Sequence, residues 1–76
     1  MIDKQEVNGL SNIMFELTVA YGLTPQKVII ATGVDYNTVV RIQSANPFVE
    51  SDDFVKVKDY VNQYYDTIIK EWFYKK

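Results

Sequence analysis

The positions of helix-ending residues are the feature that most constrains this chain. Gly22, Gly33 and the Asn46-Pro47 pair interrupt an apolar pattern that otherwise follows the three-and-four spacing of an α-helix. Glycine adopts the left-handed conformation that ends many helices, and the residue before proline is forced out of the helical region. Four helical segments remain between these interruptions. The sequence therefore predicts an all-α fold of four helices, in which the last helix is the longest.

Capping residues define the expected starts of the first three helices. Asp3 is followed three residues later by Glu6, which predicts a capping box at the start of the first helix. The Thr24-Pro25 pair begins the second helix and Asp35 the third, since a side-chain oxygen at these positions accepts a backbone N–H that the helix leaves free. The first helix carries one apolar stripe, formed by Val7, Leu10, Met14, Leu17 and Tyr21.

Length and residue types exclude most enzyme chemistry. The 76 residues are 47% hydrophobic, which predicts a single globular domain over residues 1–76. A chain of this length buries only about 60% of its unfolded surface and often depends on staples or self-association. With no Cys and no His, the chain has no disulfide, no thiol nucleophile and no imidazole base. We therefore expect no enzymatic activity, no catalytic or metal-ligating residues, no cofactor and no small-molecule ligand.

Hydropathy and charge bear on the location and partners of the chain. No basic segment followed by an apolar run opens the sequence, and no window approaches the ~18 apolar residues of a membrane span, so we expect a cytoplasmic protein without a membrane partner. The net charge is −2, from 8 basic and 10 acidic residues. Nucleic-acid-binding domains are usually strongly basic, so composition alone weighs against DNA.

The segment 24–43 has the spacing of two short helices joined by a tight turn. Such a turn requires a residue that tolerates a positive φ, together with apolar side chains on the facing helix surfaces. These requirements are met by Val28, Gly33, Val34, Val39 and Ile42. On these positions the chain resembles the phage-type helix-turn-helix DNA-binding proteins of the lambda-repressor/Cro class. Two residues depart from the class, Ile29 where alanine is usual and Thr32 where an apolar residue is usual.

The resemblance implies a sequence-specific duplex-DNA-binding transcriptional regulator in a bacterial cell or a phage-infected host. It would act as a homodimer with helix 36–43 in the major groove. The base contacts that the resemblance implies come from Tyr36, Asn37 and Arg41, since Asn pairs with adenine and Arg with guanine. The implied phosphate contacts are Thr24, Gln26, Lys27 and Thr38. The alternative interpretation of these residues is an ordinary solvated helix face.

The last helix is expected to run over about residues 52–74, capped by Ser51 or Asp52. Phe54, Val57 and Val61 fit a core stripe, but beyond Val61 apolar and aromatic groups surround most of the helix, which is typical of an intermolecular surface. The predicted surface consists of Tyr64, Tyr65, Ile68, Ile69, Trp72 and Phe73. Self-association through this surface is one interpretation. The alternative is a protein-binding modulator, a phage-type antagonist or co-regulator, that uses this helix on a helix-turn-helix scaffold.

Overall fold

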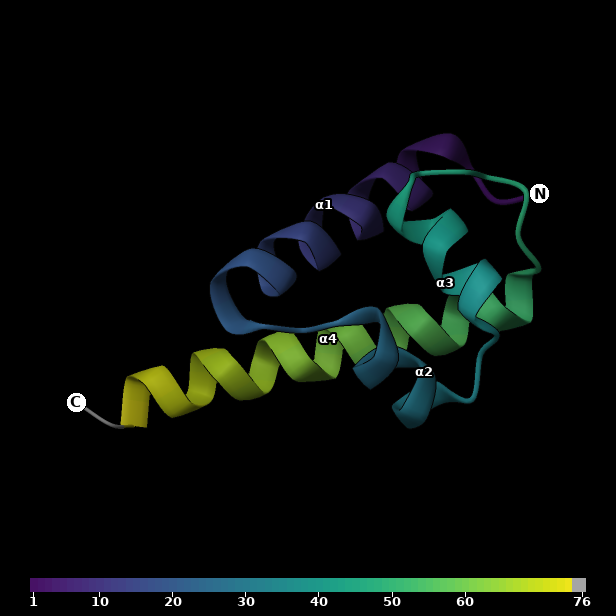
Figure 1. Cartoon of the computed structure of the whole chain (residues 1–76). Helices are drawn as coiled ribbons and strands as arrows, with labels where there is room; N and C mark the ends of the chain where they lie inside the picture. The colour runs from purple at the N-terminus through teal and green to yellow at the C-terminus, as the bar shows by residue number, and fades with distance from the viewer. Residues whose placement is uncertain (75–76) are drawn as a thin grey trace.

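The computed structural model describes residues 1–74 of the chain, and the side chains of residues 1–71. Four helices follow one another, α1 (Lys4–Tyr21), α2 (Pro25–Thr32), α3 (Tyr36–Gln43) and α4 (Ser51–Tyr74). Of the two long helices, α1 packs mainly against α3, and α4 packs mainly against α2. Helix α3 also contacts α2, and α4 extends past the end of α1 (Figure 1). The predicted all-α fold with a long last helix is confirmed.

Local capping places the ends of the first three helices where the sequence predicts them. Asp3, Thr24 and Asp35 each accept a backbone N–H of the helix that follows. Gly22 and Gly33 end α1 and α2 with φ of 71° and 72°, in the left-handed region. Asp3 accepts from the N–H of the second helical residue, at 3.1 Å, rather than from Glu6. The start of α1 is therefore capped, but not by the capping box that was expected.

The start of α4 differs by one residue from the prediction. The helix begins at Ser51, and the Phe54 N–H donates to the Glu50 carbonyl oxygen at 3.0 Å, so Glu50 takes the capping position instead of Ser51 or Asp52. Asp52 and Asp53 then fall in the first turn of the helix. Negative charge is favourable there because the N-terminal end of a helix carries a partial positive charge.

The core lies among all four helices, with α3 packed against α1 and α2, and α2 packed against α4. Val7, Leu10, Met14 and Leu17 of α1 are buried, whereas Tyr21, the last residue of the predicted stripe, is 51% exposed. Leu23 is buried in its place, because the left-handed turn at Gly22 folds the chain back onto α1. The core residues are Ile2, Val7, Leu10, Met14, Leu17, Leu23, Val28, Val34, Val39, Ile42, Val49, Phe54, Val57 and Val61.

Tyrosines extend the core side of α4 beyond its fully buried residues. Tyr60, Tyr64 and Ile68 are half-buried and pack against the core, and the ring centroids of the two tyrosines lie 6.1 Å apart. Burial, and in second place the nearby Tyr64, raise the pKa of the Tyr60 phenol above its ordinary value. Within residues 1–74, no helix has both the length and the hydropathy that crossing a bilayer requires.

Candidate nucleic-acid interface

The turn between α2 and α3 is fixed by one buried apolar residue and one hydroxyl. Val34 is only 3% exposed and anchors the turn in the core. The Thr32 hydroxyl donates to the Val28 carbonyl oxygen at 2.7 Å and accepts the Val34 N–H at 3.2 Å. Thr32 thus departs from the apolar residue usual in the lambda-repressor/Cro class while holding the turn by hydrogen bonds. The geometry of this turn determines how α3 is presented to the outside.

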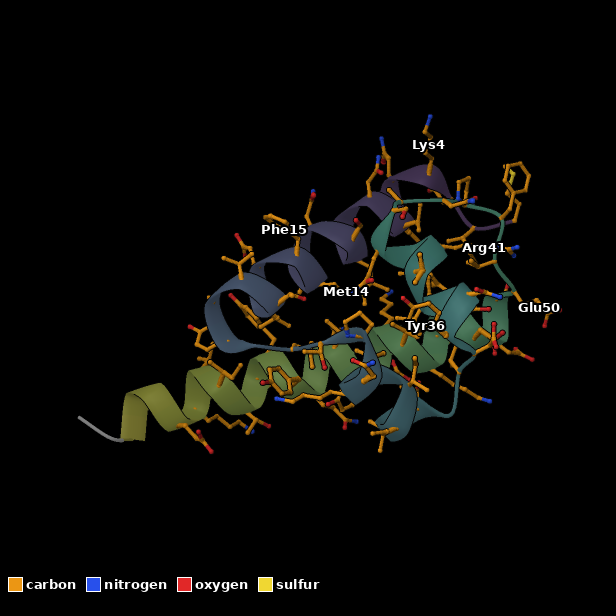
Figure 2. The ribbon with its side chains drawn as sticks, in the orientation of Figure 1. Lys4, Met14, Phe15, Tyr36, Arg41 and Glu50 are labelled. Atoms are coloured by element: carbon orange, nitrogen blue, oxygen red, sulfur yellow. The ribbon has the colours of Figure 1, made fainter. Side chains whose placement is uncertain are left out.

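The outward face of α3 carries the three predicted base contacts. Val39 and Ile42 are fully buried, and this anchors the opposite side of the helix. Tyr36, Asn37 and Arg41 are all exposed. Tyr36 and Arg41 lie near opposite ends of α3 in Figure 2. A phenol, an amide and a guanidinium, all capable of hydrogen bonding to base edges, are therefore displayed together on a helix whose other side is immobilised by packing.

The four predicted phosphate contacts fall in two places. Thr24 caps α2 by accepting the Lys27 N–H at 3.3 Å, and Gln26 and Lys27 are exposed in the first turn of the same helix. Thr38 is half-buried on α3 and lies away from them, on the side that faces the start of α4. The structure therefore groups Thr24, Gln26 and Lys27 at one helix N-terminus and leaves Thr38 beside Arg41.

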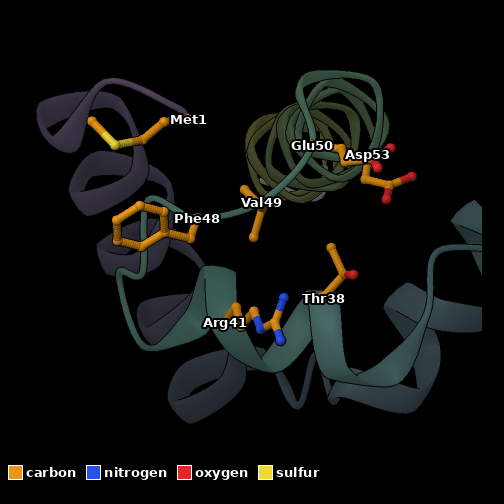
Figure 3. Close-up of a pocket in the computed structure, with 7 residues that line it drawn as sticks. All are labelled: Met1, Thr38, Arg41, Phe48, Val49, Glu50 and Asp53. Carbon is orange, nitrogen blue, oxygen red and sulfur yellow. The ribbon is translucent and has the colours of Figure 1, made fainter.

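A surface hollow of about 370 Å³ separates α3 from the start of α4. Thr38 and Arg41 line it from α3, and Glu50 and Asp53 line it from the opposite side (Figure 3). The remaining lining residues are Met1, Phe48 and Val49. Sequence reasoning missed the two carboxylates, because they are brought beside Arg41 only by the loop that joins α3 to α4. They lower the electrostatic potential around the one basic side chain of α3.

The aromatic residues predicted on the last helix divide between two environments. Tyr64 and Ile68 are half-buried against the core, and the Tyr64 hydroxyl lies 3.5 Å from the Tyr21 carbonyl oxygen. Tyr65 and Ile69 are exposed, at 43% and 36%. The side chains of Trp72 and Phe73 lie outside the described residues. Among the described side chains, only part of the predicted surface is therefore open to a partner.

Exposed apolar side chains on α1 lie next to Tyr65 and were not predicted. Phe15 and Val19 are each 70% exposed, and with Tyr21 and Tyr65 they line a hollow of about 390 Å³. Phe15 points away from the core while its neighbour Met14 points into it (Figure 2). The signal in the sequence is that Phe15 and Val19 are four residues apart and outside the core stripe of α1, so they form a second apolar stripe.

Ala45, just after the Ser44 cap of α3, has a strained backbone conformation, and replacing it with glycine should stabilise the protein. Ala45 has φ of 58°, a left-handed conformation that costs an L-residue with a Cβ roughly 1–2 kcal/mol. Ala45→Gly should therefore raise the free energy of unfolding by about 0.5–1 kcal/mol in urea denaturation. The control is Ala31→Gly at an exposed helical position, which should lower it by about 0.5–1 kcal/mol. A destabilising Ala45→Gly would contradict the left-handed conformation at this position.

The exposed groups on α2 and α3 are suited to binding. Exposed hydrogen-bond donors and acceptors lie on α2 and α3, and the inner sides of both helices are buried in the core. Within the described part of the chain, no group of three or more Asp or Glu side chains is placed to hold a metal ion. No protein-family model, curated protein or solved structure matches this chain.

Proposed function

We propose that this protein binds duplex DNA sequence-specifically, as a homodimeric transcriptional regulator that places α3 in the major groove. The proposal is carried by the exposed Asn37 and Arg41 on a helix whose Val39 and Ile42 are fully buried. Side chains that form bidentate pairs with adenine and guanine are thus held on a rigid element. An α-helix with its side chains is about 10–12 Å across, which fits the ~12 Å width of the major groove.

The N-terminus of α2 supports a phosphate contact that would fix the register on the duplex. Lys27 and Gln26 are exposed in the first turn of α2, where the helix dipole favours an anion. The Gln26 N–H has no acceptor within the helix, whereas Pro25 has no N–H and the Lys27 N–H donates to the Thr24 hydroxyl. Phosphate contacts of this kind orient a protein on DNA without reading its sequence. We assign positioning to the start of α2 and base discrimination to α3.

Charge sets the expected strength of binding. The net charge is −2, and Glu50 and Asp53 lie beside Arg41, so each copy neutralises few phosphates. Counterions are released by cationic side chains, and α2 and α3 carry Lys27 and Arg41, so a dimer would show a slope no steeper than about −4 in log affinity against log salt. One copy alone would bind weakly, and two linked half-sites would supply useful affinity.

The test is selection from a random duplex library by the purified protein at low salt, followed by the affinity of the selected sequence against salt concentration. We expect an inverted repeat with half-sites about one helical turn apart. The affinity should fall only slowly with salt concentration, because each copy neutralises few phosphates. Retention of DNA with no sequence enriched would overturn the proposal.

A protein partner in place of DNA is the second candidate. It is favoured by the carboxylates of Glu50 and Asp53 next to Arg41, which repel phosphate, and by the exposed Phe15 and Tyr65. In this case the protein would act as a modulator of another factor through its apolar surface. The library selection separates the two candidates, because a modulator of this kind enriches no duplex sequence.

A further inference from the structure

We infer that a second copy of this chain covers one face of the molecule, which we call the α1–α4 face. It is formed by Phe15, Val19 and Tyr21 of α1 with Tyr65 and Ile69 of α4. The inference deepens the proposed function by naming the surface through which the dimer forms. It rests on the proposed function for one step only, the spacing between the two α3 helices.

The α1–α4 face exposes apolar area from both helices. Large apolar and aromatic side chains present about 150–250 Å² each, so at exposures of 36–70% these five residues leave roughly 500 Å² open. The largest contiguous apolar patch of a soluble monomer is typically about 300–600 Å² and often has a function. Two such faces against each other would bury about 1,000 Å² of apolar surface, which reaches the lower limit for a specific interface before any polar rim is counted.

The charges around the α1–α4 face are compatible with a copy of the same face. A two-fold symmetric interface uses the same patch on both copies, so its charges must not repel one another. Exposed charges of both signs adjoin the residues of this face: Glu16 lines the same hollow, and Asp66 and Lys70 follow Tyr65 and Ile69 in the sequence. A two-fold copy can therefore set opposite charges against each other at the rim. Burying this surface also stabilises a chain that, at 76 residues, has a small core of its own.

Such a dimer also sets the spacing between the two α3 helices. Arg41 and Asp53 line the same hollow, so α3 lies beside the start of α4. Tyr65 is twelve residues further along, which is about 18 Å at the rise of an α-helix. A two-fold axis near Tyr65 with antiparallel α4 helices would separate the two α3 helices by about 36 Å, matching the 34–36 Å between half-sites one helical turn apart.

Oligomeric state in the absence of DNA tests the interface. Phe15→Ser removes a ring at the α1–α4 face, and Phe48→Ser is the matched control, because the two phenylalanines are 70% and 68% exposed and only Phe15 lies on this face. In sedimentation equilibrium over a concentration series, wild type and Phe48→Ser should dimerise equally. Phe15→Ser should raise the dissociation constant at least about 30-fold, since two side chains are lost per dimer.

Two results of this experiment would overturn the inference. One is a wild-type protein that stays monomeric at every concentration, and the other is a Phe15→Ser protein that dimerises as wild type does. Circular dichroism of each variant shows whether it is folded, and an exposed site should tolerate the change. If the wild-type dimer forms, its thermal midpoint should also rise with protein concentration, since association stabilises the folded state.

A distance measurement tests the position of the two-fold axis. The chain has no cysteine, so Ser44→Cys, at an exposed position at the end of α3, accepts a single spin label. The label-to-label distance in the dimer should centre at about 36 Å, and a distance below about 25 Å or above about 50 Å would overturn the axis near Tyr65. A dimer with this spacing that enriches no duplex would refute the DNA proposal and leave the interface standing.

Discussion

Replacing Ile42 by alanine should lower the free energy of unfolding by about 2–5 kcal/mol. Ile42 is fully buried and, with Val39, is one of two such residues that attach α3 to the core. Truncation removes three methylene-sized groups and leaves a cavity that packed neighbours fill only in part. A domain of this size has a total stability of roughly 4–11 kcal/mol, so the change would remove a large share of it.

Urea denaturation followed by circular dichroism measures this loss, with two reference variants on the same helix. Val40→Ala trims a half-buried side chain on the outer flank of α3 and should cost less than about 1 kcal/mol. Ile42→Val keeps most of the side chain and should cost about 0.5–1.5 kcal/mol. If Ile42→Ala costs no more than Val40→Ala, then α3 is not anchored in the core as described. The outward face proposed to bind DNA would then lack its support.

The helix boundaries were predictable because the signals that set them are local. Gly22 and Gly33 need only their own backbone freedom to end a helix, and Thr24 and Asp35 need only a backbone N–H two or three residues ahead. The start of α4 was missed by one residue, because several acidic or hydroxyl residues in a row all favour a helix N-terminus. Local pattern alone does not choose among them.

The exposed apolar side chains were harder to predict. The spacing of apolar residues shows which side of a helix faces the core, but not how far along the helix a neighbouring element covers that side. Tyr21 has the phase of the α1 core stripe, yet it is 51% exposed, because α1 ends there and the turn brings another residue into the core. The Ser11 hydroxyl donates to the Gln43 carbonyl oxygen at 2.6 Å, across 32 residues of sequence. No local pattern predicts such a contact, nor the approach of Glu50 and Asp53 to Arg41.

Replacing Arg41 by alanine should weaken binding to the selected duplex by about 10- to 100-fold for each half-site, because a bidentate contact with guanine contributes about 1–3 kcal/mol of discrimination. Arg41 is exposed on the outward face of α3 and is the only basic residue of that helix. Repeating the library selection with Arg41→Ala should show lost preference at one base position of the half-site, with the rest of the sequence retained. Fluorescence anisotropy with the wild-type sequence gives the affinity.

Lys58→Ala is the matched control for the loss of one positive charge. Lys58 is exposed on α4, five residues beyond Asp53 and on a different side of that helix. Its replacement should leave base preference unchanged, and affinity unchanged at equal dimer concentration. Sedimentation equilibrium checks the dimer, because Lys58 is seven residues from Tyr65 and shares its side of α4. Equal losses in Lys58→Ala and Arg41→Ala would indicate that general charge, and not a base contact, accounts for binding.

The position of Arg41 beside two carboxylates allows a different role, neutralisation of Glu50 and Asp53, and the two roles make opposite predictions. A neutralising Arg41 matters for stability, so Arg41→Ala would lower the free energy of unfolding and leave base preference intact. A base-contacting Arg41 matters for recognition, so the variant would fold as wild type and lose preference. Arg41→Lys sharpens the distinction, because lysine keeps the charge but lacks the planar fork that pairs with guanine. Neutralisation or a phosphate contact survives this change, whereas preference for the one base weakens because lysine contacts guanine without the fork geometry.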